Sequence, residues 1–210
     1  DKAVQKNVES NSRIAFIVGD DIATTLAYNF DGTYHYLYES LYEQKESLGH
    51  IGTSYDMLYL SDIEDGFARE YDVYLILATN VTETQKAAIN RYLKKDGKII
   101  IWVGFPGIYG SDGSMSVDYV SALTDITLAK ATTALNYGIR IIGNESLTKG
   151  LNGKLYGRIS STKVDPMFYV NDNSAETLGK IYNSDLTGLA VKAVQTEDGG
   201  YYMSIYSAVG

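Results

Sequence analysis

The sequence predicts an α/β domain with a mainly parallel sheet, and three observations support this. Short apolar runs alternate with helical patterns over the first 126 residues, as in strand–helix–strand units with helices on both faces of a sheet. The composition is that of a globular protein, with 45% hydrophobic and 21% charged residues among 210. After residue 126, short strand patterns follow one another and indicate a β-rich extension.

The first predicted strand covers Ile14–Val18. All five residues are apolar and Gly19 follows them, which is the pattern of a strand buried on both faces that ends in a turn. The first predicted helix begins at Tyr34. Apolar residues recur at helical spacing as far as Leu48, and Gly49 ends the helix.

Two further strands and a second helix follow. The strand at Tyr55–Leu60 is interrupted by Asp56, so we expect it near a sheet edge. The run Val73–Ala78 predicts a third strand, buried on both faces. Thr82 and Gln85 have the spacing of a capping box, which predicts the start of the next helix.

The segment Ile99–Val103 gives the clearest signal of a buried strand in the chain. A glycine-rich loop follows over 104–114, and a short helix is predicted at Ser116–Leu123. The loop should therefore lie at the carboxyl end of a strand, where open α/β sheets place their ligand sites.

The C-terminal part reads as a series of strands. The last two should form a hairpin through the connection 195–200, which contains two glycines. The expected strands lie near Tyr137–Ile142, Met167–Val170, Thr177–Tyr182, Leu189–Val194 and Tyr201–Ser207. We expect residues 1–12 to be a linker and 13–210 one domain, with an α/β core over 13–126 and a mixed, β-rich part over 127–210. Because position 1 is Asp rather than Met, we expect the chain to be excised from a longer protein.

Charge and cysteine content exclude several functions. With 18 basic and 26 acidic residues the net charge is −8, so we expect neither a nucleic-acid partner nor a membrane partner. The absence of cysteine excludes disulfides, thiolate metal ligands and a cysteine nucleophile. No apolar run approaches the roughly 18–20 residues of a membrane helix. No cofactor motif is present, and we predict none.

Asp20 and Asp21 end the first predicted strand and are candidate ligand residues. They resemble the metal-binding acids of response-regulator receiver domains, but the third strand ends at Asn80 without a phosphoacceptor carboxylate. One interpretation is a metal-dependent hydrolase, with Asp31 or Asp112 as a third ligand. The other is that the two acids cap a turn or a helix start.

The turn after the Ile99–Val103 strand is a second candidate site. Class I glutamine amidotransferases carry a Gly-x-Cys-x-Gly nucleophile turn at the corresponding strand, whereas this chain has Phe105 within Gly104–Gly107. Phenylalanine cannot act as a nucleophile, so amidotransferase activity is excluded. The loop Phe105–Gly113, with Phe105 and Tyr109, stays a candidate site for carbohydrate.

Nineteen tyrosines are the largest oddity of composition. Tyrosine combines a flat apolar ring with a hydroxyl and suits core packing, protein interfaces and sugar contacts alike. Tyr36 and Tyr42 should point away from the buried stripe of the first helix. They are candidate interface or ligand residues.

Several segments in a fixed order resemble a known domain. They are Leu41–Gln44, Tyr55–Ile63, Asp96–Val103, Ser116–Asp118 with Leu123–Ile126, and Ser204–Ala208. From about residue 13 to the C-terminus, the chain resembles the glutamine-amidotransferase-like domain of β-galactosidase-type glycoside hydrolases, also called the β-galactosidase trimerisation domain.

The resemblance implies a flavodoxin-like, three-layer α/β/α fold. It also implies a non-catalytic accessory domain that packs against a (β/α)8 catalytic barrel of the same parent chain and mediates association, so we expect a homo-oligomer. The family's two catalytic glutamates belong to that barrel, and no catalytic residue is carried over to this chain. A parent that degrades polysaccharides favours an extracellular or cell-surface location over the cytoplasm. An autonomous carbohydrate-binding module is the main alternative function.

Overall fold

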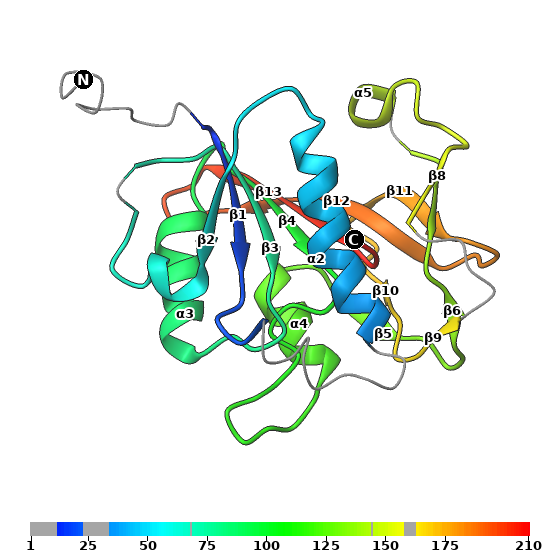
Figure 1. Cartoon of the computed structure of the whole chain (residues 1–210), viewed down its shortest axis with the longest axis horizontal. Coiled ribbons are helices and arrows are strands. Elements are labelled where there is room, and N and C mark those ends of the chain that lie inside the picture. Colours follow the sequence, from blue (N-terminus) through cyan, green and yellow to red (C-terminus); the bar gives the residue numbers. More distant parts are fainter. Residues whose placement is uncertain (1–11, 23–33, 68, 144, 158–162) are drawn as a thin grey trace, which may run out of the picture.

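An 11-stranded mixed sheet organises the computed structural model, which describes residues 12–22, 34–67, 69–143, 145–157 and 163–210 (Figure 1). Five strands lie side by side and run parallel, in the order β2 (Asp56–Tyr59), β1 (Ile14–Val18), β3 (Val73–Leu77), β4 (Ile99–Val103) and β13 (Tyr201–Ser207). All five strands were predicted from the sequence. The one interrupted by Asp56 lies at the sheet edge, as expected.

The second half of the sheet is antiparallel. Beyond β13 follow β12 (Thr187–Gln195), β11 (Glu176–Ile181), β7 (Ile139–Ile141) and β8 (Leu155–Tyr156). Strand β10 (Phe168–Val170) pairs with β12 and with β5 (Leu128–Lys130), while β6 (Leu135–Asn136) and β9 (Lys163–Val164) form a separate pair. The predicted hairpin is formed by β12 and β13.

The prediction of a mainly parallel sheet is therefore wrong for the sheet as a whole. Among the described strands of this sheet, four pairings are parallel and six are antiparallel. The reason is the position of β13, which pairs with β4 on one side and with β12 on the other. The β-rich part thus continues the parallel sheet instead of packing beside it.

Helices cover both faces of the parallel strands (Figure 1). Helix α2 (Tyr34–Gly49) packs through Leu41 on Phe16 and Val18 of β1. The opposite side of β1 faces the larger core, which contains the 3-10 helix η1 (Leu60–Ile63), α3 (Glu83–Ala88), the π-helical turn η2 (Ile89–Leu93) and α4 (Val117–Thr124). A short helix, α5 (Glu145–Thr148), lies in the β-rich part. None of the described helices is long and apolar enough to span a bilayer.

Local signals fix the helix ends. The predicted capping box is present: the Gln85 backbone N–H donates to Thr82 Oγ1 at 3.2 Å, and the Thr82 N–H donates to Gln85 Oε1 at 3.0 Å. Ser116 is the N-cap residue of α4, and its hydroxyl accepts the Asp118 N–H at 3.1 Å. Asp125 is the C-cap residue and adopts a left-handed conformation with φ of 57°.

A buried polar chain joins β4, β13 and α4. The Trp102 indole Nε1–H donates to Ser204 Oγ at 2.9 Å, and the Ser204 hydroxyl donates to the Thr124 carbonyl. Trp102 and Ser204 are completely inaccessible to solvent. Because buried polar groups need partners, this chain holds β13 in one position against its neighbours.

Candidate functional site

The carboxyl ends of the parallel strands meet at one edge of the sheet, which is where α/β proteins place ligands. Strand β1 runs into Gly19–Asp21, β3 into Thr79 and Asn80, and β4 into the loop 104–115. This edge therefore gathers most of the residues that the sequence singled out.

Asp20 is bound within the protein at this edge. Its carboxylate accepts hydrogen bonds from Gln85 Nε2 at 2.8 Å, from the Ser61 N–H at 3.2 Å and from the Ser61 hydroxyl. It thus ties the end of β1 to η1 and α3. Asp21 is half-buried and also interacts with another group of the protein.

A third carboxylate does not join this pair. Asp112 accepts the Ser114 N–H at 2.9 Å, and hydrogen bonds from Ser114 lower the pKa of Asp112 below its ordinary value. Asp31, the other predicted third ligand, lies outside the described residues. Within the described ranges, no cluster of three His, Cys, Asp or Glu side chains could hold a metal ion.

Phe105 packs inward. Its ring meets that of Phe168 edge to face, with 5.9 Å between centroids and 68° between planes, and it contacts the main core. Gly104 and Gly107 flank it with φ of 73° and 66°, and a Cβ on Gly107 would come within 2.9 Å of Leu123. The turn that carries a nucleophile in amidotransferases here anchors the loop to the core.

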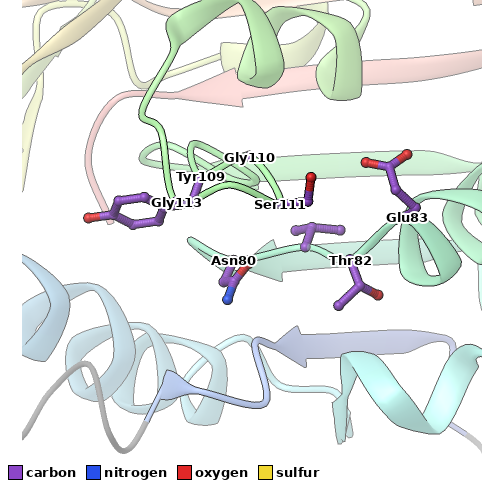
Figure 2. Close-up of a pocket in the computed structure, with 8 residues that line it drawn as sticks. Asn80, Thr82, Glu83, Tyr109, Gly110, Ser111 and Gly113 are labelled. Atoms are coloured by element: carbon purple, nitrogen blue, oxygen red, sulfur yellow. The ribbon is translucent and has the colours of Figure 1, made fainter.

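A hollow of about 470 Å³ lies between the segment 80–83 and the loop that follows β4, and we call it the strand-end hollow (Figure 2). From the loop, Tyr109, Gly110, Ser111 and Gly113 line it. Tyr109 is 39% exposed and forms isolated bridges with Asn80 and Met115. Neither histidine nor lysine is among the lining residues, so the hollow offers amide, hydroxyl and carboxylate groups and one aromatic ring.

The predicted site residues do not form one cluster. Only Tyr109 lines the strand-end hollow: Asp20 is bound to Ser61 of η1 and Gln85 of α3, and Phe105 packs on Phe168. Tyr42 lies on α2 and is 48% exposed. The side chain of Tyr36 lies outside the described residues.

A second hollow, of about 410 Å³, is apolar and was not predicted; we call it the α2 groove. The half-buried side chains of Ile14, Val73, Ile101 and Ile205 line its sheet side, and Leu48 and Ile51 line its helix side. Ile51 is 48% exposed. The sequence predicted doubly buried strands at Ile14–Val18 and Ile99–Val103 but assigned no helix to a face of the sheet, so it gave no signal for this groove.

No family model matches the sequence, and no curated protein matches it. Solved structures do match in fold. A cold-adapted β-galactosidase from Rahnella sp. R3 is 13% identical with a TM-score of 0.63, and the match covers 96% of this chain and 29% of that one. The β-galactosidase of the haloarchaeon Halorubrum lacusprofundi is 14% identical with a TM-score of 0.59, with 98% and 29% covered.

A putative ThuA-like protein from Bacteroides uniformis has the same fold in a chain of similar size. It is 13% identical with a TM-score of 0.53, and the match covers 98% of this chain and 85% of that one. The predicted resemblance to a domain of β-galactosidases is thus confirmed at the level of the fold. The chain spans less than a third of the length of the two β-galactosidases.

Proposed function

We propose that this chain is a non-catalytic accessory domain of a β-galactosidase-type glycoside hydrolase, and that its α2 groove packs against a catalytic (β/α)8 barrel of the same polypeptide. The α2 groove is the observation that carries the proposal. A second observation supports the proposal: this chain matches less than a third of each of two β-galactosidases. The rest of such an enzyme would supply the surface that covers the groove.

The groove needs a cover because a parallel sheet is normally buried on both faces. Its four half-buried aliphatic side chains, Ile14, Val73, Ile101 and Ile205, come from four neighbouring strands. Completing the burial of one such side chain stabilises an interface by about 1 kcal/mol, roughly half of its full transfer free energy. Tyr156 is exposed and lines a further hollow, which shares Leu189 and Val209 with the α2 groove. It adds aromatic surface of the kind enriched at interfaces.

The strand ends support a non-catalytic role. The turn that could hold a nucleophile carries Phe105, packed on Phe168, and the carboxylate of Asp20 is engaged by Ser61 and Gln85. Serine and cysteine nucleophiles are commonly activated by an adjacent histidine base. Neither histidine nor cysteine lines the strand-end hollow.

We also infer that the parallel half is a flavodoxin-like core within one domain, 13–210. Counted in chain order, its five strands follow the sequence 2-1-3-4-5, which is one of the two common doubly wound orders. The antiparallel strands then extend this core through β13.

The test measures binding of the 210-residue chain to the (β/α)8 domain encoded in the same gene, by calorimetry. The double variant Ile101→Glu/Ile205→Glu places charges in the α2 groove, and we expect it to weaken binding more than tenfold. Leu147→Glu, which changes an exposed aliphatic residue on α5 outside the groove, is the matched control and should bind like the parent chain.

Three results would overturn the proposal. One is a gene that encodes no such barrel, and another is equal binding by the groove variant and the control. The third is hydrolysis of p-nitrophenyl β-D-galactoside by the 210-residue chain alone. Circular dichroism of each variant verifies that the chain is folded before binding is measured.

A further inference from the structure

We propose that the strand-end hollow is a subsite for a neutral oligosaccharide, with the ring of Tyr109 as its stacking platform. The hollow shares no lining residue with the α2 groove. The inference therefore stands independently of the proposed packing.

The lining chemistry selects the class of ligand. The only ionisable carboxylate is that of Glu83, and Lys86 Nζ lies 2.7 Å from Glu83 Oε1, so the local charge is balanced. No cation lines the hollow to bind phosphate or sulfate. Among the described residues, neither the Asn80 amide nor the Ser111 hydroxyl has a hydrogen-bond partner, and such groups match the hydroxyls of a sugar.

Tyr109 supplies the apolar part of the recognition. The faces of an aromatic ring carry partial negative charge, and the C–H bonds on one face of a pyranose can pack against them. In Figure 2, Tyr109 stands at one end of the hollow and Ser111 and Glu83 at the other. The volume of about 470 Å³ lies within the usual range of small-molecule sites.

The loop holds this arrangement before any ligand binds. The Gly110 N–H donates to the Ser114 carbonyl at 2.8 Å, and the Gly113 N–H donates to the Gly110 carbonyl at 2.9 Å. A Cβ on Gly110 would come within 2.9 Å of the Tyr119 ring, so the loop lies close against that side chain. A preformed loop reduces the entropy lost on binding.

The experiment is saturation-transfer NMR of the 210-residue chain with lactose, cellobiose and maltose, each titrated to obtain a dissociation constant. For an open site we expect about 1–10 mM for at least one of the three. Tyr109→Ala should weaken binding at least fivefold, and Asn80→Ala about threefold. Tyr109→Phe keeps the ring and should bind within about twofold of the unmodified chain.

Tyr201→Ala is the control, because Tyr201 is an exposed tyrosine that does not line the hollow. We expect it to leave the dissociation constant unchanged. The inference is overturned if none of the three sugars shows saturation transfer at 20 mM. It is also overturned if Tyr109→Ala and Tyr201→Ala affect binding equally while both variants keep the circular dichroism spectrum of the unmodified chain.

Discussion

Replacing Ser204 by alanine tests whether the buried polar chain of β4, β13 and α4 determines stability. The substitution removes one oxygen atom from the centre of the core. That atom accepts the Trp102 Nε1–H at 2.9 Å and donates to the Thr124 carbonyl. Since Trp102 and Ser204 are both inaccessible to solvent, water cannot take the place of the lost hydroxyl.

The expected loss follows from the two groups left without partners. A buried donor or acceptor that loses its partner costs about 1–3 kcal/mol. For the indole N–H and the carbonyl together, the cost of losing both partners is about 2–6 kcal/mol. Burying a methyl group in place of a hydroxyl is favourable and reduces this cost. We expect Ser204→Ala to lower the free energy of unfolding by about 2–4 kcal/mol, and the melting temperature by roughly 4–16 °C.

Urea denaturation followed by tryptophan fluorescence measures the effect at the site itself, because Trp102 is the single tryptophan of the chain. The midpoint should fall while the slope of unfolding free energy against urea stays the same, since the change alters stability and not the surface exposed on unfolding.

Ser207→Ala is the matched control on the same strand. The Ser207 hydroxyl donates to the Val209 carbonyl at 2.6 Å but is only partly buried, so water can replace it. We expect a loss below about 1 kcal/mol for this variant. If Ser204→Ala costs no more than Ser207→Ala, the reasoning from buried unpaired groups is refuted.

Two further substitutions test other features of the fold. A Cβ on Gly143 would come within 2.5 Å of the Leu178 Cα, so Gly143→Ala should lower the free energy of unfolding by about 1–3 kcal/mol. At Gly49 nothing lies within 4 Å of the new methyl group, so Gly49→Ala should leave the free energy of unfolding unchanged or raise it. If urea denaturation shows the same change for Gly143→Ala and Gly49→Ala, the prediction is contradicted. Burial raises the pKa of Asp172, but hydrogen bonds, first of all from Lys192, outweigh it and hold the pKa below its ordinary 3.8. The stability from this carboxylate is therefore complete above about pH 4 and is lost as the pH falls further. Asp172→Asn should lower the free energy of unfolding by about 1.5–3 kcal/mol at pH 7. The difference between the variant and the unmodified chain should become smaller below pH 4. If it stays constant from pH 7 to pH 2.5, the charge of Asp172 is not responsible.

Local signals predicted the elements of the parallel half well. The apolar runs of β1, β3 and β4 and the Thr82–Gln85 capping box each lie within a few residues of sequence, and the structure has all of them. The pairing of β13 with β4 could not be predicted, because packing over long distances determines it. Strands of two or three residues, such as β5 and β8, are too short to give a periodic signal.

The candidate site shows the same limit. The sequence left open whether Asp20 caps a turn or binds a metal, and its hydrogen-bond partners in the structure, Ser61 and Gln85, lie 41 and 65 residues further along the chain. Phe105 was a candidate ligand residue, yet Phe168 draws it into the core from a distant strand. The α2 groove depends on how far the described helices cover each face of the sheet, and this follows only from the complete sheet order.

The central position of β13 has a consequence for synthesis on the ribosome. Met203 pairs with Ile99, and these residues are 104 positions apart (203 − 99), while every other described strand precedes β13 in the chain. Until residues 201–207 have been translated, the nascent chain carries β4 as an open edge, and β12 has no strand to join it to the parallel half. Such edges favour pairing with other chains. Premature termination before residue 201 should therefore yield an aggregating product and not a smaller folded domain.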